Sequence, residues 1–367
     1  MALPPKHITI YSVGLLGGSL ALALKSSGYK GKIVGLSSPR NLDAAFELSA
    51  IDEGGSYDDL GQVVQETDLL FLCSPITAII STLKKLKDFR LPKGLIITDI
   101  GSTKREVVEA AISLPEQVSF IGGHPLAGSE KSGAEHSDPY LFQNAVYVLT
   151  PKGEEADEQE KALASFLARF LGCRNLFLAP DEHDRIAGAV SHLPQLLSVA
   201  LANVAHDCEE KTPGTLQLAA GGFRDMTRIA ASPFGMWRDI LATNSDTVSK
   251  LLQDCIDSLQ KMKSQLAGDG LANHFTRAAK TRSRAPLGGK GFLKKLHDIL
   301  IVANDEPGVI ASISASLHEA SINIKDIEVL KVREGEGASI RMAFECRKEA
   351  EKAAKLIKEL GFQAWRR

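Results

Sequence analysis

Short apolar runs alternate with longer helix-like stretches along the first half of the chain. The runs cover residues 7–13, 32–36, 68–73, 95–99, 118–121, 145–149 and 175–178. Buried strands of this length, each followed by a helical segment, are typical of a mostly parallel sheet with helices on both faces. The pattern therefore predicts an α/β domain over residues 1–179.

The strand pattern ends near residue 180, and residues 180–280 show only helical spacing. The stretch 184–206 is apolar on most sides, and 244–267 carries an apolar stripe with Asn244 or Ser245 as its N-cap. The stripe consists of Val248, Leu251, Leu252, Cys255, Ile256, Leu259 and Met262. Because a helix that is apolar all round needs a partner on every side, we predict an all-α domain that forms a homodimer. A monomeric helical core is the alternative.

A basic stretch rich in Pro and Gly, residues 281–293, is predicted to be a linker. After it the pattern changes to strand 297–303, helix 309–320, strands 322–332 and 339–346, helix 348–360 and a short strand at 363–365. This β-α-β-β-α-β order is typical of the ferredoxin-like arrangement. Residues 294–367 are therefore predicted to form a small α+β domain.

The bulk composition excludes several classes of protein. Hydrophobic residues make up 44% of the chain, which suffices for a large core, and the net charge of −2 favours neither nucleic acid nor a membrane surface. The five cysteines form no Cys-x-x-Cys pair, so we expect no metal site and no disulfide framework. No apolar run reaches the roughly 18 residues of a membrane span, and the first residues lack a signal core. The sequence thus predicts a cytoplasmic globular protein.

A glycine-rich turn joins the first predicted strand to the first predicted helix. Residues 12–17 read SVGLLG, close to the dinucleotide fingerprint Gly-x-Gly-x-x-Gly. Gly14 would let the backbone approach the pyrophosphate, Gly17 would let the helix pack on the strand, and Leu15 and Leu16 begin the helix whose N–H groups face the phosphates. Ser12 replaces the first glycine, which a tight turn tolerates if φ stays negative. We predict a Rossmann-type NAD(P)-binding domain, with a ligand-free turn as the alternative.

The residues expected beside the adenosine ribose favour NADP over NAD. Ser37 lies 20 residues after Gly17, where NAD enzymes usually carry Asp or Glu. Two hydroxyl groups, on Ser37 and Ser38, together with Arg40, suit a 2′-phosphate better than a carboxylate would. The alternative is that Arg40 only begins the next helix in solvent.

Three polar segments follow predicted strands, at the sheet edge where open α/β sheets bind ligands. They contain Ser74 and Pro75, Gly101 and Ser102, and His124. Oxidation of an alcohol requires a group that accepts the hydroxyl proton, and histidine suits this near neutral pH. We predict His124 as that catalytic base, with Ser102 holding either the imidazole or the substrate hydroxyl. A structural histidine is the alternative.

A second candidate lies at residues 221–228, which contain Arg224 and Arg228. Four residues apart on a helix, they would share a face and could clamp a dianion. A solvated charged face is the alternative.

These segments together resemble the prephenate/arogenate dehydrogenase family of tyrosine biosynthesis. The matching motifs are GLLGGSL (14–20), DIGSTK (99–104), GGHPLAGSEKSG (122–133), SHLP (191–194), FRDMTRIA (223–230) and WRDI (237–240). The resemblance covers residues 7–280. The C-terminal region resembles an ACT domain, with the ligand-loop residues Asn304, Pro307, Gly308 and Val309, which implies feedback control by an amino acid, here tyrosine.

The resemblance implies a mechanism and a set of substrate-binding residues. Hydride would pass from C4 of prephenate to the nicotinamide while His124 polarises the C4 hydroxyl, and loss of the ring carboxylate as CO2 would aromatise the ring. Arg228 would bind a carboxylate with help from Arg224. Ser129 and Glu130 are also placed at the substrate. Gln195 stands where many prephenate-using members have a second histidine, which leaves prephenate and arogenate open as substrates.

Two further functions stay open at this point. One is a dehydrogenase of the same fold that acts on another hydroxy acid or an imine. The other is a non-catalytic protein that binds the cofactor and senses an amino acid. His124 and Ser102, both at predicted strand ends, argue against a sensor without catalysis.

Overall fold

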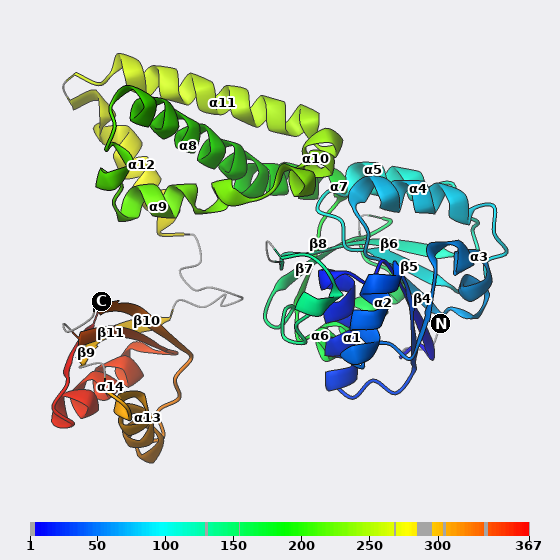
Figure 1. Cartoon of the computed structure of the whole chain (residues 1–367), viewed down its shortest axis with the longest axis horizontal. Coiled ribbons are helices and arrows are strands. Elements are labelled where there is room, and N and C mark those ends of the chain that lie inside the picture. The colour runs from blue at the N-terminus through cyan, green and yellow to red at the C-terminus, as the bar shows by residue number, and fades with distance from the viewer. Residues whose placement is uncertain are drawn as a thin grey trace. The chain divides into compact units, whose positions relative to one another are not determined.

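The computed structural model describes residues 4–128, 131–153, 155–267, 269–284, 296–303, 306–333 and 337–366, without the side chains of 330–333, 337 and 338. The chain forms two compact units, Met1–Gly268 and Asp269–Arg367 (Figure 1). Most of the linker predicted at 281–293 lies outside the described residues, and helix α12 (Ala272–Arg282) covers its first two positions.

The first unit is built on an eight-stranded sheet with the order β3-β2-β1-β4-β5-β6-β7-β8. Strands β1 to β6 are parallel, whereas β7 is antiparallel to β6 and parallel to β8. The strands are β1 (His7–Tyr11), β2 (Lys32–Leu36), β3 (Glu53–Gly55), β4 (Leu69–Leu72), β5 (Ile96–Asp99), β6 (Ser119–Pro125), β7 (Val146–Thr150) and β8 (Arg174–Phe177). The predicted mostly parallel sheet is confirmed.

Helices cover both faces of this sheet (Figure 1). One core joins the sheet to α1, α2 and α6, and a second core joins the opposite face to α3, α4 and α5. The helices are α1 (Leu15–Ser26), α2 (Pro39–Glu47), α3 (Leu60–Val63), α4 (Ile76–Leu86), α5 (Arg105–Ala111) and α6 (Glu158–Leu171). In β4, Leu69 and Phe71 enter the first core while Leu70 and Leu72 enter the second. A strand buried on both faces has to be apolar throughout, which explains the continuous runs in the sequence.

Two strand predictions need correction. Strand β3 was not predicted, because its residues Glu53–Gly55 are polar or small and pair only at the sheet edge. The fifth predicted run, 118–121, continues to Pro125, because Gly122, Gly123 and His124 pair with β7. His124 therefore lies inside a strand, near its carboxyl end, rather than in a loop after it.

A helical part follows the sheet within the same unit. It contains α7 (Pro180–Ala187), α8 (Leu193–Lys211), α9 (Gly221–Thr227), α10 (Phe234–Thr243) and α11 (Ser245–Ser264). Helix α7 continues through a π-helical turn, Gly188–His192, directly into α8, so the helix predicted at 184–206 is longer at both ends. Helix α11 fits the predicted stripe, although the side chain of Asn244 makes no capping hydrogen bond.

Helix α10 is fastened to the N-terminus of α4. The Oδ2 atom of Asp239 accepts hydrogen bonds from the Thr77 backbone N–H at 3.1 Å and from Thr77 Oγ1 at 2.6 Å. Ile240 and Trp237 add apolar contacts to the core on that side of the sheet. A carboxylate at a helix N-terminus is favourable because the N–H groups there are unpaired and carry partial positive charge. The sheet and the helical part are therefore joined by polar and apolar contacts.

The second unit contains a four-stranded antiparallel sheet with the order β10-β11-β9-β12. After α12, its elements are β9 (His297–Ala303), α13 (Val309–Glu319), β10 (Asp326–Arg333), β11 (Gly337–Phe344), α14 (Arg347–Glu359) and β12 (Gln363–Arg366). The predicted β-α-β-β-α-β order is confirmed. The strand expected from residue 322 begins only at Asp326, because Ile322 and Ile324 enter the core from the loop before it.

No helix among the described residues has both the length and the apolar character that crossing a membrane would require.

Candidate active site

The glycine-rich turn begins with a backbone conformation that the sequence did not predict. Ser12 has φ +76°, in the left-handed region, whereas the prediction required a negative φ. Its N–H donates to the Leu36 carbonyl at 2.7 Å, and its own carbonyl accepts from the Gly14 N–H at 3.0 Å. These two bonds force the chain to turn sharply between β1 and α1. A residue with a Cβ atom pays about 1–2 kcal/mol for this conformation, which explains why glycine is usual there.

The two glycines of the turn meet different surroundings. A Cβ atom on Gly17 would lie 2.5 Å from the Ser12 carbonyl oxygen and 3.1 Å from Ile10, so only glycine lets α1 pack this closely. A Cβ atom on Gly14 would meet no atom within 4 Å, so the backbone there is open to an approaching ligand. Leu15 and Leu16 begin α1, whose free N–H groups point toward this opening. The arrangement fits the pyrophosphate of a dinucleotide.

At the predicted ribose position, the arginine is paired with a carboxylate. The Arg40 guanidinium lies 2.6 Å from Glu135 Oε1, and the arginine side chain is otherwise 84% exposed. Ser37 is buried, and its hydroxyl lies 3.4 Å from the hydroxyl of Tyr57. Glu135 follows β6 and was not considered from the sequence. A 2′-phosphate would therefore compete with Glu135 for Arg40.

The carboxyl ends of β4 and β5 bring the predicted polar segments to one edge of the sheet. Ser74 follows β4, and its buried hydroxyl has no hydrogen-bond partner among the described residues. Pro75 precedes the first turn of α4. The Gly101 N–H donates to Asp99 Oδ2 at 2.7 Å, which folds the loop after β5 back onto that strand. Because β1, β4, β5 and β6 are parallel, these segments share an edge with the glycine turn.

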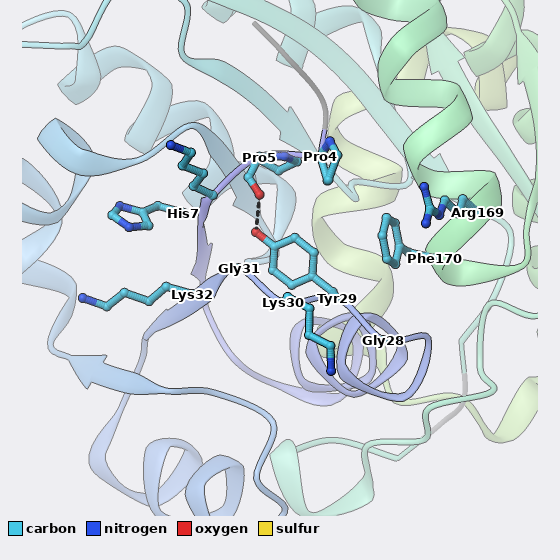
Figure 2. A pocket seen from close by; sticks show the side chains of 11 residues that line it. Pro4, Pro5, His7, Gly28, Tyr29, Lys30, Gly31, Lys32, Arg169 and Phe170 are labelled. Carbon is cyan, nitrogen blue, oxygen red and sulfur yellow. Dashed lines mark hydrogen bonds between the residues drawn. The ribbon is translucent and has the colours of Figure 1, made fainter.

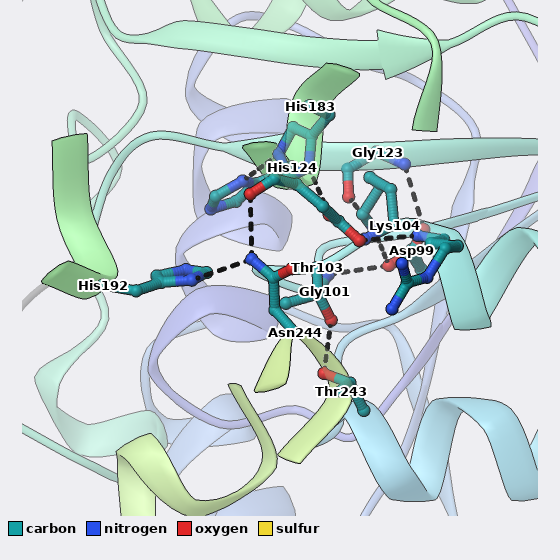
Figure 3. A network of polar contacts seen from close by, with 12 residues as sticks. Asp99, Gly101, Thr103, Lys104, Gly123, His124, His183, His192, Thr243 and Asn244 are labelled. Carbon is teal, nitrogen blue, oxygen red and sulfur yellow. Dashed lines mark hydrogen bonds and ion pairs between the residues drawn. The ribbon is translucent and has the colours of Figure 1, made fainter. Parts of the chain in front are cut away.

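His124 contacts a histidine that sequence reasoning missed. Its Nδ1 lies 2.7 Å from Nε2 of His183 in α7, and the two rings meet edge-on with centroids 5.0 Å apart (Figure 3). Orienting the His124 ring was expected of Ser102, but in this structure His183 makes that contact. Ser102 is partly buried, and its side chain makes no hydrogen bond within the described residues. Its predicted contact with the substrate hydroxyl stays a prediction.

Asp184 contacts His183 in turn, so that His124, His183 and Asp184 form a line of three polar residues. His183 Nδ1 lies 2.8 Å from Asp184 Oδ1, and both residues are almost fully buried. The backbone N–H groups of Lys104 and Arg105 donate to the two oxygens of Asp184, at 2.7 and 3.0 Å. The only hint in the sequence is a His-Asp pair in an acidic helix start, which by itself points to no function. The contact with His124 spans 59 residues of sequence and depends on the fold.

A buried ion pair lies next to the strand that carries His124. The ammonium group of Lys104 contacts Asp99 and donates to the Gly123 carbonyl at 2.7 Å (Figure 3). The Gly123 N–H donates to Asp99 Oδ1 at 3.0 Å. Lysine and aspartate are both fully buried, so removal of either partner would leave an unpaired charge in the core. The pair fixes β5, the loop after it and the strand that carries His124.

This environment keeps His124 neutral. Burial, together with His183, the Lys104 ammonium and His192, holds the pKa of His124 well below its usual value. Burial also lowers the pKa of Lys104, against the opposing effect of Asp99. Burial alone would raise the pKa of Asp184, but hydrogen bonds from His183 and from the two backbone N–H groups lower it. A neutral imidazole and an ionised carboxylate are therefore the stable forms.

Three polar residues of the helical part, His192, Gln195 and Asn244, are also buried. His192 lies in the π-helical turn and stacks edge-on against Trp237, and Asn244 Nδ2 lies 3.2 Å from its Nδ1. Burial lowers the pKa of His192 to about 4. Gln195, predicted to bind substrate, is buried and donates to the Ile229 carbonyl at 3.0 Å, while its Oε1 has no partner among the described residues.

The predicted arginine clamp does not lie on one regular helix. Helix α9 ends at Thr227, and Arg228 begins a 3-10 turn, Arg228–Ala231. Arg224 and Arg228 are exposed, and neither forms an ion pair within the described part of the chain. Ser129 and Glu130, also predicted to bind substrate, lie outside the described residues, as does Asn304 of the C-terminal loop.

A pocket of the described chain lies at the opposite edge of the sheet. It has a volume of about 540 Å³, lies at the amino ends of β1 and β2, and is lined by Lys6, Lys30, Lys32 and Arg169 (Figure 2). Tyr29 closes one side by donating to the Pro5 carbonyl at 2.7 Å. Since the polar groups described above gather at the carboxyl ends of the strands, this pocket is separate from the candidate active site.

Comparison with known proteins agrees with this geometry. Residues 20–174 match the family model of the prephenate dehydrogenase nucleotide-binding domain, and residues 179–280 match that of the prephenate dehydrogenase dimerization domain. Prephenate dehydrogenase of Bacillus subtilis is 34% identical over 95% of this chain and 95% of its own length. That of Lactococcus lactis is 35% identical over 96% of this chain and 98% of its own length.

Solved structures show the same likeness. Prephenate dehydrogenase from A. aeolicus, in complex with hydroxyphenyl propionate and NAD+, is 32% identical with a TM-score of 0.69, and the match covers 77% of this chain and 99% of that one. Arogenate dehydrogenase of Synechocystis is 31% identical with a TM-score of 0.64, over 76% of this chain and 99% of that one. The predicted Rossmann-type domain followed by a helical dimerisation domain is confirmed. The chain belongs to the prephenate dehydrogenase family.

Proposed function

We propose that this protein catalyses the oxidative decarboxylation of prephenate to 4-hydroxyphenylpyruvate, with hydride transfer to NAD(P), as a step of tyrosine biosynthesis in the cytoplasm. The observation that carries the proposal is the neutral imidazole of His124, held by His183 at the sheet edge that also bears the dinucleotide turn. A neutral imidazole can accept a proton, whereas an imidazolium cannot.

The residues divide the chemistry between them. Bound NAD(P) would supply the oxidised nicotinamide that accepts hydride from C4 of the substrate. His124 accepts the proton of the C4 hydroxyl as the C–O bond becomes a carbonyl. When the ring carboxylate leaves as CO2, its bonding electrons enter the ring, and the phenolate oxygen takes the proton back from His124. Ser102 donates a hydrogen bond to the same substrate oxygen.

The substrate carboxylates require cationic partners. Arg228 is the proposed partner, with Arg224 assisting, since both are exposed and lack a carboxylate partner within the described residues. Ser129 and Glu130 are proposed to complete the site. Gln195 offers an unpartnered Oε1 atom, which would accept a hydrogen bond from the ammonium group of arogenate. This single observation keeps arogenate as the second candidate substrate.

Substitution of the base tests the proposed function. His124→Asn should lower kcat by about 10²- to 10⁴-fold, because general-base catalysis contributes about that much. NAD(P) binding, measured by fluorescence quenching, should be unchanged, because the glycine turn is intact. Arg228→Ala should instead raise KM for prephenate by about 10- to 100-fold, the usual loss for a charged hydrogen bond. Turnover near the wild-type value in His124→Asn would reject the assignment.

Assays of prephenate and arogenate against NAD and NADP resolve substrate and cofactor together. The preference for NADP, predicted from Ser37 and Arg40, stays a prediction. Because Glu135 competes for Arg40, Glu135→Gln should raise the ratio of kcat/KM for NADP to that for NAD, and Arg40→Ala should lower it. An unchanged ratio in both variants would remove Arg40 from cofactor recognition. Stoichiometric CO2 release separates this reaction from simple hydroxy-acid oxidation.

We also propose that residues 294–367, within the second unit, form an ACT-type regulatory domain that binds tyrosine. Its β-α-β-β-α-β order supports this, and so does Gly308, which has φ +96° at the start of α13 and lies in the predicted ligand loop with Pro307 and Val309. Millimolar tyrosine should inhibit the full-length enzyme. Activity that tyrosine leaves unaltered would contradict the proposed control.

A further inference from the structure

The carboxylate of Asp184 is fixed as a hydrogen-bond acceptor at the start of α5. Both its oxygens accept backbone N–H groups, from Lys104 at 2.7 Å and from Arg105 at 3.0 Å. An ionised carboxylate has no hydrogen to donate. The contact of 2.8 Å between Asp184 Oδ1 and His183 Nδ1 therefore requires the hydrogen to be on His183 Nδ1.

The position of that hydrogen decides the state of the next ring. A neutral imidazole protonated on Nδ1 carries its lone pair on Nε2. Nε2 of His183 lies 2.7 Å from Nδ1 of His124, so the hydrogen of this contact belongs to His124 Nδ1. It follows that Nε2 of His124 is unprotonated, and this is the atom left to act as a base.

We propose that Asp184 and His183 are positioning residues that hold His124 in the tautomer whose Nε2 accepts the substrate proton. When that proton arrives, His124 becomes an imidazolium whose Nδ1–H still donates to His183, while Asp184 stays ionised and His183 stays neutral. No proton passes from His124 to His183 or to Asp184. The catalytic part of this inference rests on the proposed function, whereas the tautomer of His124 does not.

The other charged groups around the line agree with a neutral pair of rings. Lys104 brings a positive charge from the start of α5, and Asp99 of β5 pairs with it. His192 approaches from the π-helical turn, and the side chain of Asn244 donates to the Asp184 carbonyl at 2.8 Å. A second cation on His183 would lie beside Lys104 in a buried region. A doubly protonated His183 would also reverse the contact, leaving the hydrogen on Nε2 of His124.

Asp184→Ala tests the line by removing the acceptor of the His183 Nδ1–H. Oδ1 of Asp184 accepts from both His183 and the Lys104 backbone N–H, so an asparagine would satisfy both with its amide oxygen and keep the tautomer. Alanine instead leaves His183 free to carry its hydrogen on Nε2, which turns His124 into the other tautomer. Nitrogen-15 NMR of the histidine-labelled full chain reads the tautomer directly, with the His124 signal identified by its loss in His124→Asn. We expect a protonated Nδ1 and an unprotonated Nε2 on His124 in the wild type, and a population with a protonated Nε2 in Asp184→Ala. We expect kcat to fall by about 10-fold or more with little change in KM.

A matched control separates this role from simple helix capping. Asp239 caps α4 as Asp184 caps α5, but it contacts no histidine in the described structure. Asp239→Ala should therefore leave the His124 tautomer unchanged. His183→Phe, which keeps a ring but removes the acceptor, covers the case in which Asp184→Ala fails to fold, and it should also lower kcat.

Two results would overturn the inference. One is a protonated Nε2 on His124 in the wild type. The other is normal kcat in folded His183→Phe or Asp184→Ala protein. If His124→Asn is inactive while these variants are normal, the proposed function stands and only the positioning role is lost.

Discussion

Ser12 has a left-handed backbone conformation that is strained for a residue with a Cβ atom. The left-handed backbone is imposed by the hydrogen bonds that turn the chain from β1 into α1. Its side chain offers little in return, since the hydroxyl lies 3.5 Å from that of Tyr57. The strain therefore comes from the geometry of the turn, and the contact of the hydroxyl group does little to offset it.

Ser12→Gly should stabilise the protein by about 0.5–1 kcal/mol. Relief of the left-handed strain is worth about 1–2 kcal/mol, and the greater freedom of glycine in the unfolded chain removes part of it. The measurement is the urea midpoint at constant m-value. Ser12→Ala is the matched control, because it removes the hydroxyl but keeps the strain, and it should show no gain. Equal stability changes in both variants would refute the argument.

His192 makes the folded state sensitive to acid. Its pKa is about 4 in the folded protein and near 6.5 when the chain is unfolded. Between these values the unfolded chain binds a proton that the folded one does not, so stability falls as the pH falls from about 6.5 to about 4. The full loss is on the order of 3 kcal/mol.

Replacement of His192 should flatten that dependence. In His192→Leu the urea midpoint should change less between pH 7 and pH 4.5 than in the wild type, even if the variant is less stable overall. His206→Leu is the control, because His206 is largely exposed and its loss should leave the slope as it was. If the urea midpoint changed equally with pH in the wild type and in His192→Leu, His192 would not be the source of the acid sensitivity.

At the scale of elements, the junction of α4 and α10 is one of the polar links between the sheet and the helical part. Two hydrogen bonds from Thr77 reach one carboxylate oxygen of Asp239. The link joins residues 162 positions apart, so it depends on the tertiary fold and not on the local sequence. Its contribution can be separated from that of the apolar contacts around it.

A double-mutant cycle of Thr77→Ala and Asp239→Ala should give a coupling free energy of about 1 kcal/mol. This is the usual value for a partly exposed hydrogen bond to a charged group near a helix N-terminus. Arg238→Ala in place of Asp239→Ala is the comparison, since Arg238 lies over the ring of Phe234 and has no bond to Thr77. A coupling near zero for Thr77 and Asp239 would mean that the apolar contacts alone hold the junction.

The pattern of apolar residues predicted the strands that are buried on both faces of the sheet, but it did not predict the strand at the sheet edge. The inner strands are apolar because both faces are covered, so β4 and β5 could be read directly from the chain. Strand β3 could not, because an edge strand of Glu53–Gly55 needs no apolar residue. Local sequence also singled out His124 and the glycine turn as candidates. It could not single out His183 and Asp184, because the contact of His183 with His124 forms only when α7 packs beside β6.

At the scale of the whole molecule, apolar side chains on the helical part lack cover in a single chain. Val204, Met226, Phe234 and Leu259 are all more than half exposed. Exposure of this kind is expected where a second copy packs, and the match to a dimerisation domain supports a homodimer. We therefore expect the second copy of the chain to pack against these four side chains of the helical part.

Leu259→Asp should weaken the dimer by at least about tenfold, because a buried charge in an apolar interface costs more than 1.4 kcal/mol. Sedimentation velocity over a range of concentrations gives the dissociation constant. Ile112→Asp is the control, since Ile112 is 79% exposed but lies at the end of α5, away from the helical part. If both variants remain dimeric at the lowest concentration, the contact lies elsewhere.

The π-helical turn Gly188–His192 has a consequence for how this chain can vary in length. It stands between His183, whose Nε2 contacts His124, and Gln195, which donates to the Ile229 carbonyl. One residue more or less in a helix rotates everything beyond it by about 100°. A deletion here would therefore turn the whole of α8 about its own axis while leaving its composition intact. The orientation of α8 relative to α7 therefore depends on the number of residues in the turn. Substitutions in the turn should be tolerated better than insertions or deletions.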